Sequence, residues 1–139
     1  MILIGIDTGV HTGYAISVDG EFTTIETTKI HRALQYVLSL SYENEIFVRV
    51  EDARKRRWYG TSGKEKLQGA GSIKRDASIW EDFLKDNKIP HEMVAPKNNK
   101  TKLSEEVFKR ITKWDGRTSE HSRDAAMLIF GYKMNNIRK

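Results

Sequence analysis

The chain contains no cysteine, and none of its apolar runs is longer than about five residues. Without cysteine there can be no disulfide framework, no thiolate zinc site and no thiol nucleophile. The short apolar runs exclude a membrane-spanning helix, and no basic segment precedes the first of them, so a signal peptide is not expected. We therefore expect a cytoplasmic protein with no membrane partner. Any metal it holds must be bound by oxygen or imidazole.

The length and charge of the chain limit the class of protein further. A chain of 139 residues is long enough to bury a core, and we expect one domain over residues 1–139. The 24 Lys and Arg residues exceed the 19 Asp and Glu residues, which gives a net charge of +5. This excess of positive charge favours a polyanionic partner such as nucleic acid.

The first third of the chain predicts three antiparallel strands and a helix. Apolar and β-branched residues predict strands at 2–7, 13–18 and 22–27, and the Asp19-Gly20 pair predicts a tight hairpin turn between the second and third. Apolar residues at helical spacing then predict an amphipathic helix over 28–41.

Strands and helices alternate in the middle of the chain. A strand at 45–51 ends on a carboxylate, Glu51, and a polar, basic loop is expected over 52–66. A long helix should follow and end before Pro90. Its apolar residues at helical spacing are Ala70, Ile73, Ala77, Trp80 and Leu84. A short strand is expected at 92–95.

Two helices are expected at the C-terminal end. Ser104 is a suitable N-cap for the first, which should end at Gly116. Its apolar face would carry Val107, Ile111 and Trp114. Ser119 should begin the last helix. The residues expected to share one face of that helix are Asp124, Leu128, Gly131 and Tyr132.

This element order predicts an α/β protein with a five-stranded mixed sheet flanked by helices. It is the order of the ribonuclease H-like fold, in which the first and fourth strands are neighbours. Asp7, at the end of the first strand, and Glu51, at the end of the fourth, would then lie close together. The N-terminal residues of the last helix would reach the same edge of the sheet.

Three short motifs on these elements resemble a known family. They are Gly5-Ile6-Asp7-Thr8-Gly9 with Gly13-Tyr14-Ala15, then Val50-Glu51, then His121-Ser122-Arg123-Asp124-Ala125-Ala126. In order and position they resemble the RuvC-like Holliday junction resolvases, and the resemblance spans nearly the whole chain. Where many members have proline after the first aspartate, this chain has Thr8.

The resemblance implies a metal-dependent active site. Asp7, Glu51 and Asp124 would be its acidic ligands, and His121 would stand where members have an aspartate or a histidine. Phosphodiester hydrolysis by two divalent ions needs hard oxygen ligands, so Mg²⁺ or Mn²⁺ is the expected cofactor, with two ions per site. We expect Asp7 to bridge both ions, Glu51 to hold one and Asp124 to hold the other.

The sequence leaves open the role of His121 and the choice between Glu51 and Asp52 as a metal ligand. His121 lies three residues before Asp124, so the two share a helix face. The imidazole could bind metal, orient the attacking water or protonate the leaving 3′ oxygen. Asp52 could replace Glu51 as a ligand, whereas Asp115 and Glu120 are expected to be solvated acids.

Basic and aromatic residues form two candidate DNA-binding segments. In the first, four cations precede two aromatics that can stack on unpaired bases: Arg54, Lys55, Arg56, Arg57, Trp58 and Tyr59. The alternative is a solvated loop with Trp58 in the core. The second segment follows Ala95-Pro96 and is similar to a lysine-bearing segment of the family: Lys97, Lys100 and Lys102.

The resulting hypothesis is an endonuclease that resolves branched DNA, above all four-way junctions, and leaves 5′-phosphate and 3′-hydroxyl ends. Two symmetric cuts require two active sites, so a homodimer is expected. Ala70, Gly71 and Ala77 could allow close helix approach in that dimer, or they could pack on the sheet.

Three alternatives remain. The chain could be a ribonuclease on structured RNA or an RNA–DNA hybrid, or a non-catalytic basic DNA-binding module. Asp7-Thr8-Gly9 is also similar to the phosphate loop of sugar kinases and actin-like ATPases, but those proteins need two such domains around the nucleotide.

Overall fold

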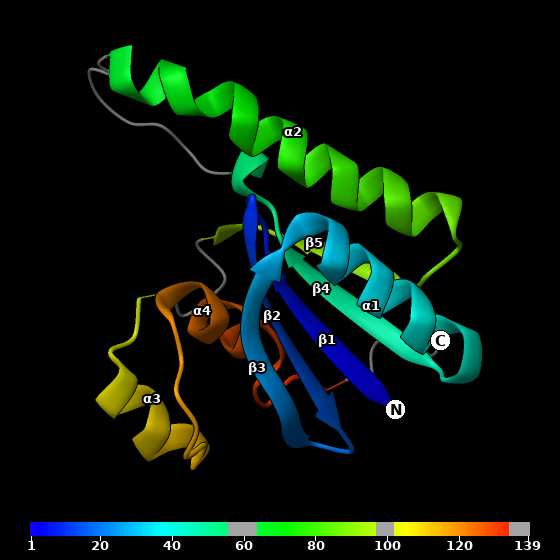
Figure 1. Ribbon diagram of the computed structural model, residues 1–139, viewed down its shortest axis with the longest axis vertical. Helices are drawn as coiled ribbons and strands as arrows, with labels where there is room; N and C mark the ends of the chain where they lie inside the picture. Colours follow the sequence, from blue (N-terminus) through cyan, green and yellow to red (C-terminus); the bar gives the residue numbers. More distant parts are fainter. Residues whose placement is uncertain (56–63, 97–101, 134–139) are drawn as a thin grey trace.

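A five-stranded mixed sheet forms the centre of the protein (Figure 1). The computed structural model describes residues 1–55, 64–96 and 102–133. The strand order is β3-β2-β1-β4-β5. Strand β2 is antiparallel to both β1 and β3, whereas β4 is parallel to both β1 and β5. The strands are β1 (Ile2–Asp7), β2 (His11–Val18), β3 (Glu21–Lys29), β4 (Ile46–Glu51) and β5 (His91–Val94).

The expected hairpin turn is present between β2 and β3. Asp19 and Gly20 have φ angles of 51° and 90°, the pair of positive values that a two-residue turn with right-handed strand twist requires. The helices are α1 (Ile30–Glu43), the 3₁₀ turn η1 (Ala53–Lys55), α2 (Lys64–Asp86), α3 (Glu105–Thr112) and α4 (Glu120–Ile129).

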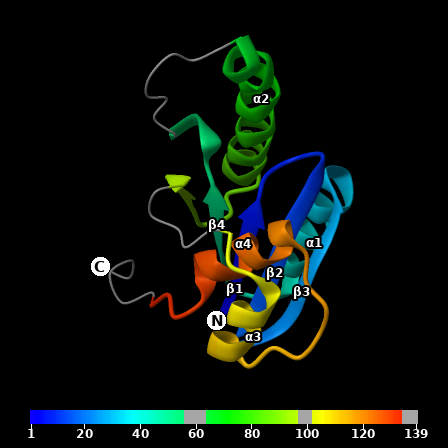
Figure 2. The ribbon, with the colours of Figure 1, turned by 90° about the vertical axis from the view of Figure 1, so that its left-hand side faces the viewer.

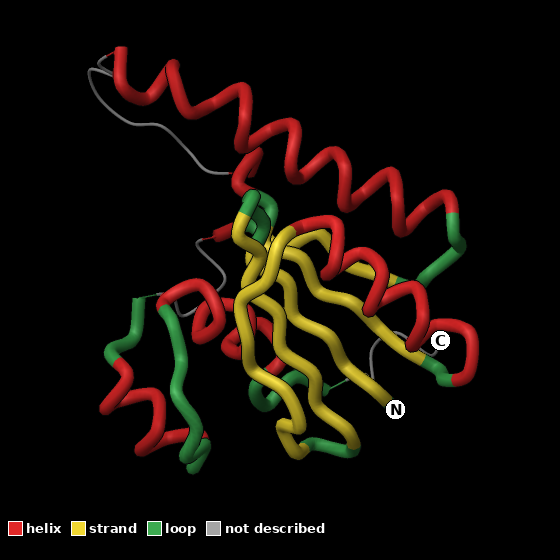
Figure 3. The backbone as a smooth tube through the Cα atoms, viewed as in Figure 1, coloured by secondary structure: helices red, strands yellow, loops and turns green. Residues whose placement is uncertain are grey.

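Helices cover both faces of the sheet, and each face has its own apolar core (Figures 2 and 3). Alternate residues of β1 divide between the cores. Ile4 and Ile6 face α1 and α2, whereas Leu3 faces α3 and α4. As expected, the long helix α2 packs Trp80 and Leu84 on the sheet. Ala77 is fully buried too, so it packs within the chain and not on an outer surface.

The last two helices are shorter than predicted. Helix α3 ends at Thr112 and not at Gly116, because Lys113 takes a left-handed conformation with φ of 65°. Its buried residue is Phe108, whereas Ile111, expected on the apolar face, is exposed. Helix α4 begins after Ser119 as expected but ends at Ile129, so Tyr132 lies beyond it.

Within the described ranges, no helix combines the length and the apolar character that crossing a bilayer requires.

Candidate active site

Asp7 and Glu51 end two neighbouring parallel strands and are direct register partners, as the sequence predicted. Neighbouring strands lie about 4.8 Å apart, and partner side chains point to the same face. Asp7 has the same parity along β1 as Leu3, so it faces α4. Glu51 is only 6% exposed. The sheet therefore holds two carboxylates side by side beneath the N-terminal end of α4.

Two glycines let α4 approach the sheet at this edge. A Cβ atom on Gly5 would lie 2.0 Å from the carbonyl oxygen of Ala125, and one on Gly13 would lie 2.1 Å from that of His121. Both distances are far shorter than any real van der Waals contact. Glycine at these positions is therefore what brings the first turn of α4 to the end of β1.

The close approach joins the sheet carboxylates to the two predicted residues of α4. Nδ1 of His121 lies 2.8 Å from Oδ2 of Asp7, a hydrogen bond when Nδ1 carries the proton. Asp124 is 8% exposed, and its Oδ1 accepts a 2.8 Å hydrogen bond from the backbone N–H of Lys102. The structure thus brings Asp7, Glu51, His121 and Asp124 together. It also places Lys102, one of the predicted DNA contacts, beside Asp124.

These residues line one cavity of about 260 Å³. Burial raises the pKa of Asp7 to about 6, even though the hydrogen bond from His121 opposes the change. Burial also raises the pKa of Asp124, against the hydrogen bond from Lys102. Carboxylates that share a desolvated cavity are costly to ionise, and a bound cation would relieve that cost.

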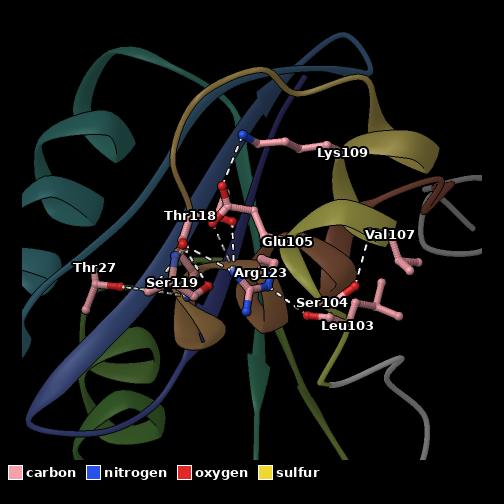
Figure 4. Close-up of polar contacts among 10 residues, drawn as sticks. Thr27, Leu103, Ser104, Glu105, Val107, Lys109, Thr118, Ser119 and Arg123 are labelled. Atoms are coloured by element: carbon pink, nitrogen blue, oxygen red, sulfur yellow. Dashed lines mark hydrogen bonds and ion pairs between the residues drawn. The ribbon is translucent and has the colours of Figure 1, made fainter.

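The first turn of α4 is held in place by contacts on both sides (Figure 4). Ser119 caps the helix in a reciprocal capping box with Ser122. Its hydroxyl also lies 2.5 Å from the hydroxyl of Thr27 on β3. Arg123 donates to the carbonyl oxygens of Leu103 and Thr118, which ties the segment after Lys102 to α4. These contacts fix the position from which His121 and Asp124 reach the cavity.

Asp76, on α2, is a further cavity residue that sequence reasoning missed. It is 8% exposed, and its one charged contact in the described structure is Arg75, at 3.7 Å. The sequence did carry a signal, since Asp76 lies four residues before the apolar Trp80 and therefore on the same face of α2. What it could not supply was the rotation of α2 relative to Asp7.

The donor atoms around the cavity suit a hard divalent cation. Carboxylate oxygens from four separate elements, β1, β4, α2 and α4, are the ligands that Mg²⁺ or Mn²⁺ prefers. Among the described residues, no three acidic or histidine side chains converge on a single point that could hold an ion. The side chains line the cavity walls. Their chemistry and burial suit a divalent cation, but they are not arranged as a coordination shell.

Asp52 does not share the Glu51 site, because it belongs to an ion-pair network. Its side chain is 1% exposed and accepts two hydrogen bonds of 2.8 Å from the guanidinium of Arg54. Burial alone would raise the pKa of Asp52, but the hydrogen bonds from Arg54 outweigh it and hold the pKa below its usual value. Arg54 also pairs with Glu81 of α2 at 3.0 Å.

Replacing Arg54 by methionine is expected to destabilise the fold by about 2 kcal/mol, because Asp52 would be left buried without its cation. The midpoint and slope of urea unfolding at pH 7 measure this change. Arg110→Met, which removes an exposed arginine of α3, is the matched control and should shift the unfolding free energy by less than about 0.5 kcal/mol. Equal effects of the two substitutions would contradict this interpretation of the network.

Of the remaining predicted DNA contacts, the structure describes only Lys55 and Lys102. Lys55 donates a 2.8 Å hydrogen bond to the carbonyl oxygen of Met93, so it holds η1 against β5, as Arg54 holds it against α2. Lys102 lines the cavity. Six predicted contacts lie outside the described residues: Arg56, Arg57, Trp58, Tyr59, Lys97 and Lys100.

Comparison with known proteins identifies the fold. No protein-family model matches the chain, and no curated protein sequence matches it. Among solved structures, the chain is similar to RuvC of T. thermophilus in complex with a Holliday junction substrate, with a TM-score of 0.58. The two are 20% identical, and the match covers 94% of this chain and 91% of that one. The predicted α/β, ribonuclease H-like fold is confirmed.

Proposed function

We propose that the chain is a metal-dependent endonuclease that cleaves branched DNA, above all four-way junctions. The observation that carries the proposal is the shared cavity of Asp7, Glu51 and Asp124, in which burial raises the pKa of two carboxylates. The similarity of the fold to a protein bound to a Holliday junction supports the choice of substrate. The net charge of +5 also suits a polyanion.

Three carboxylates of the cavity are proposed as metal ligands. Asp7, Glu51 and Asp124 would hold two Mg²⁺ or Mn²⁺ ions, with Asp7 shared between them. Bound metal supplies an activated water and stabilises charge on the attacking and leaving oxygens. The products would carry 5′-phosphate and 3′-hydroxyl ends.

His121 is proposed to donate the proton that the leaving 3′ oxygen needs. Its Nδ1–H is held against Asp7, which orients the ring and leaves Nε2 as the atom that can reach substrate. In the imidazolium form, Nε2–H would give its proton to the leaving oxygen and leave a neutral ring with its Nδ1–H on Asp7. The side chain is 58% exposed, so a nucleic-acid strand entering the cavity can reach it. The Asp7 contact therefore orients the imidazole while keeping its other nitrogen accessible.

The protein can cut two strands of a four-way junction symmetrically only if two such cavities act together. The active form is therefore proposed to be a homodimer. Cross-linking or light scattering of the protein with bound junction measures this stoichiometry. Two chains per junction are expected, whereas one chain per junction with symmetric double cutting would contradict the dimer.

The function is tested by incubating the protein with a labelled four-way junction and Mg²⁺ or Mn²⁺. Parallel reactions contain a linear duplex of the same sequence and an RNA–DNA hybrid. We expect paired cuts in the junction and slow cutting of the duplex. Preferential cutting of the hybrid would support the ribonuclease alternative, and tight junction binding without hydrolysis would support the binding module.

Asp76 is proposed to assist metal binding from α2. Asp76→Asn is expected to raise the Mg²⁺ concentration for half-maximal thermal stabilisation about 10-fold, since a supporting carboxylate beside the ligands would be lost. The melting temperature without metal should not fall, because a buried charge is removed. Asp82→Asn, an exposed aspartate of the same helix, is the control. A lower melting temperature with unchanged metal dependence would show that Asp76 is only structural.

A further inference from the structure

A second cavity, of about 380 Å³, lies at the same edge of the sheet, where β2 begins and β3 ends. Its walls are formed by His11, Thr27, Thr28, Lys29, His31 and Arg32. We call it the basic cavity. Every lining side chain can donate a hydrogen bond, and none is a carboxylate.

The basic side chains of the basic cavity have no partners in the described part of the chain. The side chains of His11, Lys29, His31 and Arg32 are all exposed. No ion pair or hydrogen bond engages any of these four side chains there, whereas Arg49, Arg54 and Arg123 each bind a carboxylate or carbonyl oxygen. Positive charge that the fold does not neutralise is available to an external anion.

The basic cavity adjoins the carboxylate cavity. Thr27, in its wall, lies 2.5 Å from the hydroxyl of Ser119, the N-cap two residues before His121 (Figure 4). The turn that follows Asp7 is also tied to the start of α1, because the N–H of Ile30 donates a 3.1 Å hydrogen bond to the carbonyl oxygen of Val10. Strand β3 is two strands from β1, a separation of about 10 Å at the usual strand spacing.

This separation fits the spacing of phosphates along one nucleic-acid strand. Because the strand winds round its axis, neighbouring phosphates lie farther apart than the axial rise of about 3.4 Å per nucleotide, and 10 Å corresponds to about one or two nucleotides. Guanidinium, ammonium, imidazole and hydroxyl donors match the oxygens of a phosphate. The lining has no phenyl, phenol or indole ring, and every side chain in it is a hydrogen-bond donor, so it suits a phosphate better than a nucleobase.

We propose that the basic cavity binds a backbone phosphate of the strand whose scissile phosphate lies at Asp7, about one or two nucleotides away. This inference rests on the proposed nuclease function and adds to it a positioning site on the β3 side. Because the basic cavity lies away from the reacting atoms, it should contribute equally to binding substrate and transition state. Its loss should therefore raise KM and leave kcat nearly unchanged.

The test measures binding of a labelled four-way junction by fluorescence anisotropy in EDTA, over a range of salt concentrations. The variant Lys29→Gln with Arg32→Gln removes two cations of the basic cavity. The control, Lys88→Gln with Arg110→Gln, removes two exposed cations from the turn before β5 and from α3. All four residues are exposed, and unfolding curves check that each variant folds. Arg32→Glu is the second test variant, which reverses one charge instead of removing two.

The cavity variant is expected to bind the junction about 10-fold more weakly, with the slope of log affinity against log salt reduced by about 1 to 2. The control should change affinity less than about twofold. Arg32→Glu should weaken binding as well. In Mg²⁺, KM should rise in the cavity variant and kcat should stay within about twofold of the unmodified value.

Three results would overturn the inference or its premise. Equal affinities and salt slopes for the cavity and control variants would show that no backbone phosphate binds there. Inorganic phosphate could stabilise the unmodified protein but not the cavity variant, while both proteins bind the junction equally well. That result would assign the cavity to a free phosphate. If the unmodified protein neither binds nor cuts nucleic acid, the proposed function itself fails.

Discussion

Replacing Asp7 by asparagine is expected to lower junction cleavage about 1,000-fold or more, because the amide cannot supply the shared anionic ligand. The same substitution should make the folded protein more stable at pH 8. Cleavage of a labelled junction in single-turnover conditions measures the first effect, and urea unfolding measures the second. Junction cleavage within about tenfold of the unmodified rate would contradict the assignment of Asp7.

The stability gain follows from the raised pKa of Asp7. Burial raises this pKa from 3.8 to about 6, so the folded protein holds the proton more tightly than the unfolded chain does. The stability this provides is full below the unfolded pKa and is lost as the pH rises through about 6. Asp7→Asn avoids this loss, which amounts to about 3 kcal/mol at pH 8 and about half as much at pH 5.

The control for this pH dependence is Asp115→Asn, which changes an exposed aspartate outside the cavity. It should alter the unfolding free energy equally at pH 5 and pH 8. A gain for Asp7→Asn that is independent of pH, or a loss at pH 8, would show that burial of Asp7 does not disfavour its charge.

Replacing Gly13 by alanine is expected to destabilise the fold by about 3 kcal/mol and to remove activity with it. The added methyl group would lie 2.1 Å from the carbonyl oxygen of His121 and 2.9 Å from the backbone nitrogen of Ser122. Both are backbone atoms, so α4 as a whole must move away from β2. His121 would then lose its contact with Asp7, and Asp124 would leave the cavity.

Gly71→Ala is the matched control for Gly13→Ala. Gly71 lies in α2, where an added Cβ would meet no heavy atom within 4 Å. Alanine should therefore leave stability unchanged or raise it by up to about 1 kcal/mol. Chemical denaturation and junction cleavage measure both variants. A Gly13→Ala protein with normal stability and activity would contradict the close packing of α4 on the sheet.

The pairing of the two strand-end carboxylates could be predicted from the sequence. A continuous apolar run predicts the first strand and alternation predicts the fourth, and the ribonuclease H-like architecture indicated by the element order makes the two strands neighbours. Asp7 and Glu51 are in direct register, as this reasoning requires. Gly13 belongs to the motif that resembles the family. Why this position requires glycine is seen only in the structure, where the α4 backbone passes directly over it.

The ends of the last helices could not be predicted, because contacts distant in sequence determine them. The sequence placed Tyr132 on the face of the last helix. In the structure it lies beyond α4, its ring 6.0 Å from that of Phe47 and 4.1 Å from the guanidinium of Arg49. These partners are on β4, and no local pattern indicates them. Arg54 is a similar case, since Asp52 and Glu81 bind the cation that sequence alone assigned to DNA.

The central claim is that carboxylates from β1, β4 and α4 form one metal centre. Anomalous diffraction from crystals soaked in Mn²⁺ tests it most directly. We predict two peaks in the cavity, each within about 2.3 Å of an oxygen of Asp7, with Glu51 beside one and Asp124 beside the other. No peak in the cavity, at Mn²⁺ concentrations that saturate cleavage, would contradict the claim.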